Sequence, residues 1–367
     1  MAIRPSRIIF PLLTFGASLA LVILVLEACL RLFAPQDLIR AMAIRLDPEL
    51  IYTLTPGHEA FLKGTDTRKF HLKTNSLGLR DREILFNKAP GVYRILLLGD
   101  STSMAEGVEI DDIYLKRLEK LLNRESRHVE TINAAIRGYG NDQELLLYRR
   151  LGKRFAPDLV ILAFFTQNDF DDNWNGQLFK VERGKLIQQR PTPESSRKFK
   201  YYQSQARAQN WPGYSLAMAH SHLANWLRNR MALLITGRIY NDTAAAYPAA
   251  SHPLEEEPRC RLTLAILKAW NEEVQQDGAR SLLLIIPFRY DVRQLRQEPP
   301  AEIERKDLAI ERFCGNEHIA CLNLTPAFIK YKGDFEALWL DGGHFTPEGH
   351  AWVAQELARY LTKSFLK

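Results

Sequence analysis

The chain has 367 residues, of which 46% are apolar and 25% are charged. This balance excludes a disordered chain, and four cysteines at this length exclude a small disulfide-built scaffold. The net charge of +6 is unevenly placed, because residues 177–250 hold 11 Lys and Arg against 3 Asp and Glu. The basic character therefore belongs to one segment.

The N-terminus has the composition of a membrane anchor. Arg4 and Arg7 precede an uncharged stretch from Ile8 to Leu26, which is long enough to cross a bilayer core of about 30 Å. We expect residues 1–34 to form a single-pass anchor in the inner (plasma) membrane. The two arginines favour a cytoplasmic N-terminus and hence an extracytoplasmic, periplasmic main body. A buried helix is the alternative.

Residues 35–90 are predicted to form a connector with one short strand near Phe70. A buried strand then ends abruptly at Gly99-Asp100-Ser101. Because ligands bind at the carboxyl edge of parallel sheets, this strand places the Ser101 hydroxyl where chemistry takes place. Gly-Asp-Ser is also a common turn sequence, so an ordinary loop is the alternative.

Strands alternate with helices through the rest of the chain, apart from a long interruption at about residues 173–258. This alternation predicts an α/β fold with a doubly wound, mostly parallel, five-stranded sheet. The predicted strands are Ile95–Leu98, Val129–Asn133, Leu159–Phe164, Ser281–Ile286 and Ile319–Leu324. The predicted helices are Asp111–Arg124, Asp142–Arg154, Arg261–Gln276, Ile303–Phe313 and Ala351–Leu361.

Two strand ends carry further candidate residues. Gly138 follows the second strand, where a glycine permits close approach of the backbone to a ligand. Asn168 follows the third strand, and the intervening helix is expected to begin with a cap at Asn141 or Asp142. Each residue by itself also fits an ordinary turn.

A histidine precedes the last predicted helix. Thr346 and Pro347 are suited to the cap and first position of that helix, so His344 lies in the loop before it. Asp341 stands three residues earlier. This spacing suits an acid/base imidazole whose orientation and charge the carboxylate stabilises.

The interruption at about residues 173–258 is a basic, aromatic-rich insert. Within it, Leu216–Arg238 is predicted to form one amphipathic helix. The insert is interpreted either as a solvated cap or as a surface for anionic lipid headgroups or an acidic polymer. Nucleic acid is not an expected partner. Outside the insert, Cys314 and Cys321 are expected either to pair, with Cys260 as the competing partner, or to remain inert thiols.

Together, Gly99-Asp100-Ser101, Gly138, Asn168 and Asp341-x-x-His344 resemble the blocks of the SGNH (GDSL-like) hydrolase superfamily. The resemblance covers Tyr93–Asp172 and Arg259–Leu361, and it implies a flavodoxin-like hydrolase domain over residues 91–367. The N-terminal anchor and Thr74–Arg80 resemble the membrane-anchored bacterial branch of that superfamily.

The resemblance implies a role for each block. Ser101 would be the nucleophile, His344 its general base and Asp341 the group that orients His344. The oxyanion hole would combine the backbone N–H groups of Ser101 and Gly138 with the Asn168 side-chain amide. One departure is Thr166-Gln167 before Asn168, where the family commonly has a glycine. A larger side chain there could narrow the pocket or shift the amide.

The implied activity is that of a serine esterase or acyltransferase. Its substrate would be an O-acyl group, in particular O-acetyl, of an envelope or extracellular polysaccharide. A membrane-surface lipid esterase or lysophospholipase and a non-catalytic binding or assembly protein are the alternatives. No cofactor is expected, and no Cys/His grouping has the spacing of metal ligands. The sequence does not decide between hydrolysis and acyl transfer.

Overall fold

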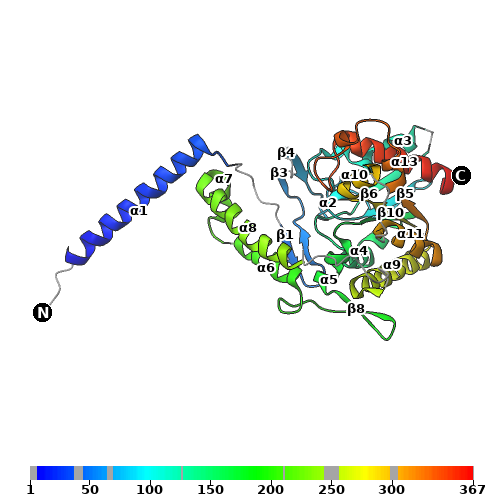
Figure 1. Cartoon of the computed structure of the whole chain (residues 1–367), viewed down its shortest axis with the longest axis horizontal. Coiled ribbons are helices and arrows are strands. Elements are labelled where there is room, and N and C mark those ends of the chain that lie inside the picture. Colours follow the sequence, from blue (N-terminus) through cyan, green and yellow to red (C-terminus); the bar gives the residue numbers. More distant parts are fainter. Residues whose placement is uncertain are drawn as a thin grey trace. The chain divides into compact units, whose positions relative to one another are not determined.

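The computed structural model describes residues 6–36, 44–63, 69–124, 127–209, 211–243, 256–297 and 305–366. The chain divides into two compact units (Figure 1). One unit comprises Met1–Ala41 with Ala208–Ala246, and the other comprises Met42–Arg207 with Tyr247–Lys367. The predicted insert is thus shared, because its first part folds with the sheet and its second part folds with the N-terminal helix.

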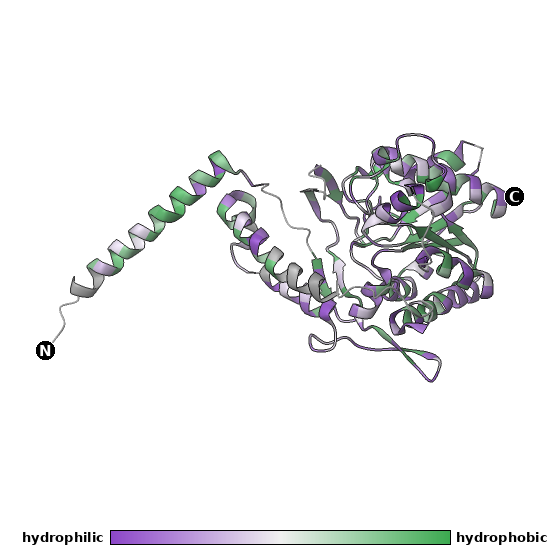
Figure 2. Cartoon of the chain, viewed as in Figure 1, coloured by the Kyte–Doolittle hydropathy of each residue, from purple (hydrophilic) through white to green (hydrophobic). Residues whose placement is uncertain are grey.

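The smaller unit is built on one long apolar helix, α1 (Ser6–Phe33). Residues Phe10–Phe33 are long and apolar enough to cross a membrane, as expected of a membrane anchor or a signal sequence. Hydrophobic residues run along most of this ribbon (Figure 2). The unit also contains α7 (Tyr214–His220) and α8 (His222–Thr243).

The prediction of one helix over Leu216–Arg238 is wrong, because the chain breaks between α7 and α8. Ser221 has an extended backbone (φ −110°, ψ 120°), and its hydroxyl accepts the Ala224 N–H at 3.0 Å. The Glu27 carboxylate of α1 accepts the N–H groups of His222 and Leu223 at 2.9 and 2.8 Å. Both acceptors satisfy backbone donors at the first turn of α8, which fixes where this helix begins.

The larger unit contains a five-stranded sheet in the order β11-β10-β7-β5-β6. All neighbouring strands are parallel, which confirms the predicted doubly wound α/β fold. The strands are β5 (Tyr93–Leu98), β6 (Val129–Asn133), β7 (Leu159–Phe165), β10 (Arg280–Ile286) and β11 (Cys321–Asn323).

The central strands are apolar on both faces because helices cover both sides of the sheet. One set of inward residues, including Ile95 and Leu284, packs with α3 (Tyr114–Asn123) and α13 (Pro347–Ser364). Residues of the opposite set, such as Leu96, are equally buried. On that side lie α4 (Asn141–Arg150) and α9 (Pro258–Gln276) (Figure 1).

The connector contains more structure than the single predicted strand. It holds two antiparallel hairpins, since β1 (Ile44–Asp47) pairs with β2 (Ile51–Leu54) and β3 (Glu59–Lys63) pairs with β4 (Lys69–Lys73). A third hairpin opens the insert and is formed by β8 (Phe179–Glu182) and β9 (Lys185–Gln188). The other helices are α2 (Ser101–Met104), α5 (Asp169–Gly176), α6 (Arg197–Gln209), α10 (Arg289–Gln297), α11 (Lys306–Asn316) and α12 (Thr325–Ile329), with single 3₁₀ turns at Ile110–Asp112, Gly152–Phe155 and Glu336–Leu338.

Arg80 joins the connector to the loop that follows Ser101. Its guanidinium is fully buried and donates to the carbonyls of Met104, Ala105 and Val108 at 2.8, 2.6 and 2.6 Å. A fourth bond, at 3.0 Å, reaches the His71 carbonyl in β4. Because a planar guanidinium holds several donors in fixed directions, this contact sets the end of α2 relative to the connector.

The cysteines that the sequence singled out are neighbours at the edge of the sheet. Cys314 lies in α11 and Cys321 begins β11, and both are free thiols, as is buried Cys260. A hydrogen bond with the Cys314 thiol, together with burial, raises the pKa of Cys321. A raised pKa keeps the thiol protonated and hence weakly reactive.

Candidate active site

Ser101 lies at the corner between β5 and α2. The Asp100 carboxylate caps α2 by accepting the Thr102 N–H at 2.9 Å and the Thr102 hydroxyl at 2.8 Å. A glycine is required at position 99, because a Cβ atom there would lie 2.7 Å from Ser103 Cβ. Asp100 is thus a structural acceptor for its own turn.

His344 and Asp341 lie in the loop before α13. The Thr346 hydroxyl accepts the Gly349 N–H at 3.1 Å, which confirms the predicted cap of this helix. Asp341 Oδ1 accepts the backbone N–H groups of Gly343 and His344 at 2.7 and 2.8 Å. These two bonds orient the carboxylate, so that its second oxygen faces the imidazole.

The three side chains form a continuous hydrogen-bonded chain. His344 Nδ1 lies 2.8 Å from Asp341 Oδ2, and His344 Nε2 lies 3.0 Å from Ser101 Oγ. Burial acts to lower the pKa of His344, but the hydrogen bond and charge of Asp341, aided by Glu106 and Asp100, outweigh it and raise the pKa. This geometry allows the imidazole to take the Ser101 proton and hold it as a stabilised cation.

Gly138 has a left-handed backbone (φ +71°), which favours glycine. A Cβ atom there would lie 2.6 Å from the Tyr202 hydroxyl and 3.0 Å from the Tyr52 hydroxyl. The two tyrosine rings stack at 3.7 Å, and the Tyr52 hydroxyl donates to the Arg137 carbonyl. The connector and the insert therefore both pack against the Gly138 loop, which the sequence did not indicate.

The two backbone N–H groups that the resemblance assigns to the oxyanion hole are those of Ser101 and Gly138. Within the described residues, neither the Ser101 N–H nor the Gly138 N–H donates to a protein acceptor. Unpaired N–H groups of this kind can bind a developing oxyanion.

Asn168 lies at the end of β7, as predicted, and its amide nitrogen is held by two carboxylates. It donates to Asp172 Oδ2 at 2.7 Å and to Asp100 Oδ2 at 3.3 Å. Gln167 is exposed, while Thr166 is buried and its hydroxyl accepts the Phe288 N–H at 3.1 Å. Thr166, one of the two residues that stand where the family commonly has a glycine, is thus accommodated by a hydrogen bond to the loop after β10.

Two further carboxyl groups are buried beneath this edge of the sheet. Asn141 Nδ2 donates to Glu144 Oε2 at 3.1 Å and to Asp169 Oδ2 at 3.0 Å. Burial raises the pKa of both carboxyls well above the usual range. The predicted cap of α4 at Asn141 or Asp142 is wrong, because Gly140 is the cap residue and Asn141 serves this buried pair instead. Asp169 also accepts the Phe165 N–H at 2.8 Å, so it is a structural acceptor for the end of β7.

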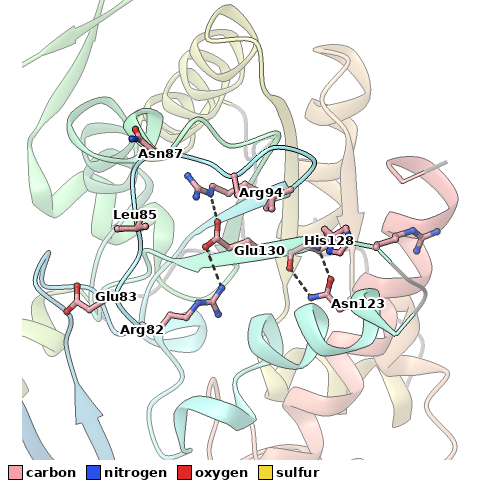
Figure 3. A pocket seen from close by; sticks show the side chains of 12 residues that line it. Arg82, Glu83, Leu85, Asn87, Arg94, Asn123, His128 and Glu130 are labelled. Carbon is pink, nitrogen blue, oxygen red and sulfur yellow. Dashed lines mark hydrogen bonds and ion pairs between the residues drawn. The ribbon is translucent and has the colours of Figure 1, made fainter.

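A hollow of about 830 Å³ lies elsewhere, at the amino ends of β5 and β6 (Figure 3). Its polar groups bond with one another, since Arg94 Nε donates to Glu130 Oε2 at 2.6 Å and Asn123 Nδ2 donates to the Val129 carbonyl at 2.9 Å. Ser101 and Asn168 follow the opposite ends of their strands. The hollow therefore does not belong to the candidate active site.

Across the described ranges of the chain, no group of three or more His, Cys, Asp and Glu side chains is arranged to hold a metal ion. The serine, imidazole and carboxylate that the structure joins by hydrogen bonds are groups suited to acyl transfer.

The fold and the site define a serine ester hydrolase. The chain belongs to the GDSL-like lipase/acylhydrolase family, whose sequence model matches residues 97–352. A comparison with curated proteins finds no match.

Several solved structures are similar to the chain at low sequence identity. TesA is 15% identical, with 74% of this chain and 98% of TesA covered at a TM-score of 0.41. The esterase EstA from Pseudoalteromonas sp. is 14% identical, with 75% and 99% covered at 0.40. The acetyl xylan esterase AlAXEase is 13% identical, with 73% and 99% covered at 0.41.

Proposed function

We propose that this protein is a membrane-anchored serine esterase or acyltransferase that acts on O-acyl groups, in particular O-acetyl groups, of an envelope or extracellular polysaccharide. The observation that carries the proposal is the bridge that His344 makes between Ser101 and Asp341. The polysaccharide substrate is supported by the resemblance to the anchored bacterial branch.

In the proposed reaction, Ser101 Oγ attacks the acyl carbonyl carbon while its proton passes to His344 Nε2. Asp341 stabilises the resulting imidazolium. The negative charge that develops on the carbonyl oxygen is taken by the N–H groups of Ser101 and Gly138 and by the Asn168 amide. His344 then returns the proton to the leaving sugar oxygen, which breaks the ester bond and leaves an acyl-serine. Water or a second hydroxyl releases the acyl group by the same steps in reverse.

The direct test is covalent labelling of the hydroxyl. A fluorophosphonate should label the wild-type protein at Ser101, and Ser101→Ala should abolish both labelling and release of acetate from acetylated glycans. Ser103→Ala is the matched control, since the Ser103 hydroxyl is buried and bonded to the Tyr114 hydroxyl at 2.7 Å. This variant should retain labelling at Ser101. An unlabelled and inactive wild type would favour a binding or assembly protein.

We further propose that α1 anchors the protein in the inner membrane with the sheet-containing unit on the periplasmic side. Arg4 and Arg7 before the apolar helix support this orientation. A reporter enzyme that works only outside the cytoplasm, fused after Lys367, should be active. Activity of a cytoplasm-specific reporter at the same position would contradict the orientation.

A lipid esterase that works at the membrane surface is the second candidate. It is favoured by the exposed apolar side chains of Leu216 on α7 and Leu227 and Met231 on α8, which lie in the same unit as α1. Apolar side chains on a helix can enter the headgroup region of a bilayer. Parallel assays with acetylated glycans and lysophospholipids distinguish the two substrates.

A further inference from the structure

The Asn168 amide is held on one side only. Its nitrogen donates to Asp172 Oδ2 at 2.7 Å and, over a longer distance of 3.3 Å, to Asp100 Oδ2, whereas its oxygen is buried and has no hydrogen-bond partner among the described residues. An amide can rotate to exchange its nitrogen and oxygen, and only the nitrogen can donate to an oxyanion. The shorter bond, to Asp172, therefore does most to select the nitrogen position, and the second N–H, which is held by Asp100 only at 3.3 Å, is the one that can turn to an oxyanion in the proposed reaction.

Asp172 lies one turn beyond Asn168 on α5, and its N–H donates to the Asn168 carbonyl at 2.7 Å. The second carboxylate oxygen, Oδ1, lies 3.3 Å from Lys198 Nζ. Each carboxylate oxygen of Asp172 thus faces a different group: Oδ2 faces the amide nitrogen of Asn168, and Oδ1 faces the ammonium group.

Lys198 comes from α6, at the start of the basic insert, and belongs to the same compact unit as Asp172. Its residue exposure is only 7%, while its neighbours Arg197 and Lys200 are exposed. In the described part of the chain, Lys198 Nζ has no hydrogen-bond partner of good geometry, but it forms the ion pair with Asp172. A buried ammonium group is costly without an opposite charge.

We propose that Lys198 and Asp172 are positioning residues, which hold the Asn168 amide with its nitrogen toward the oxyanion. This inference rests on the proposed function. An ionised carboxylate has no proton to donate and accepts only from the amide nitrogen, which excludes the rotated amide. A protonated Asp172 could instead donate to the Asn168 oxygen and stabilise the unproductive rotamer. Lys198 favours the ionised form.

The charges around Asp172 give this arrangement a pH dependence. Burial raises the pKa of Asp172 to about 6, with Lys198 opposing the rise and Asp100 and Asp171 adding to it. Asp142 on α4, Asp169 on α5, Tyr52 on β2 and Tyr202 on α6 also face this carboxyl group. Because the pKa is raised, the ionised form is lost as the pH falls through about 6. Removal of the Lys198 charge should raise the pKa further and move this loss to higher pH.

The test replaces Lys198 and follows hydrolysis of a small neutral ester, such as p-nitrophenyl acetate. Lys198→Met should lower kcat by about 10- to 100-fold with little change in KM, since a misoriented donor costs less than the roughly 100- to 1,000-fold of a deleted one. The acid limb of the pH profile of kcat in Lys198→Met should shift to higher pH. Lys198→Arg should retain most of the wild-type kcat, and Arg207→Met, on the same helix but exposed, should match the wild-type kcat and pH profile.

Asp172→Asn provides the second arm if Lys198→Met does not fold. It should lower kcat to a similar degree, and the double variant should be no worse than either single variant, because the two residues act through one amide. Wild-type kcat and pH profile in Lys198→Met or in Asp172→Asn would overturn the inference. Equal losses in Lys198→Met and Lys198→Arg, accompanied by lower melting temperatures, would assign Lys198 to folding and also overturn it.

Labelling of Ser101 separates this inference from the proposed function. If the wild type is labelled and active while Lys198→Met is unchanged, only the positioning role fails. If the wild type is neither labelled nor active, the proposed function itself fails.

Discussion

Replacing Asp341 with Asn should change both the pH profile and the maximum rate of ester cleavage. In the wild type, burial lowers the pKa of His344, but Asp341, aided by Glu106 and Asp100, outweighs burial and raises the pKa. Only the neutral imidazole can accept the Ser101 proton, so activity should rise with pH through a value above the ordinary histidine pKa of about 6.5. Without the Asp341 charge, burial dominates and the pKa of His344 should fall. The acid limb should therefore move to lower pH.

The plateau rate of Asp341→Asn should fall by about 100- to 10,000-fold, since an amide neither stabilises the imidazolium nor holds the required tautomer. The assay is kcat/KM for a small neutral ester across the pH range, with Asp111→Asn as the control. Asp111 is an exposed carboxylate paired with Lys120, so its replacement should change neither the acid limb nor the plateau of the pH profile. An unshifted acid limb or an unchanged plateau in Asp341→Asn would refute the role assigned to this carboxylate.

Three further predictions concern the Gly138 loop, the buried Arg80 and the exposed cations of α6. Gly138→Ala should lower kcat at least about 10-fold in a folded protein, because the new Cβ atom would lie 2.6 Å from the Tyr202 hydroxyl. The left-handed backbone at this position would cost an alanine about 1–2 kcal/mol in addition. An unchanged kcat would contradict this prediction. Arg80→Met should reduce the free energy of unfolding by about 3 kcal/mol or more, since it leaves three buried carbonyl groups without a hydrogen-bond donor. An unchanged melting temperature in detergent would contradict this prediction. The double variant Arg197→Gln, Lys200→Gln should bind anionic vesicles or an acidic polymer more weakly than the wild type at low salt, while its cleavage of small esters stays intact. If the double variant binds as tightly as the wild type, these charges are only solvated and contact no anionic partner.

The sequence predicted the sheet well because its signals are local. Apolar runs that stop at turn residues mark strands such as β5, and a cap such as Thr346 marks a helix start, so the ends that carry Ser101, Asn168 and His344 could be located. Parallel topology then brings those ends to one edge of the sheet. The helix break at Ser221 also had a local signal, because a serine is suited to cap the start of a helix. The apolar periodicity continues on both sides of Ser221, and this continuity favoured one uninterrupted helix.

Contacts between distant segments had no such signal. Arg197, Lys198 and Lys200 are alike in charge and adjacent in sequence, yet only Lys198 is buried. Nothing in the local pattern indicates that its partner is Asp172. The stacking of Tyr52 on Tyr202 is equally invisible, because a connector residue and an insert residue meet only in the folded chain.

The excess positive charge of residues 177–250 therefore does not describe one surface. Lys198 is neutralised inside the sheet-containing unit, and Tyr202 on the same helix packs against the Gly138 loop. Arg228 and Arg230, in contrast, lie on α8 in the unit that contains α1. If the whole insert were a detachable binding surface, its loss would spare the cleavage of small esters. Because α6 supplies Lys198 to Asp172, removal of the insert should also impair the chemistry at Ser101, and only the exposed cations can be assigned to an external anionic partner.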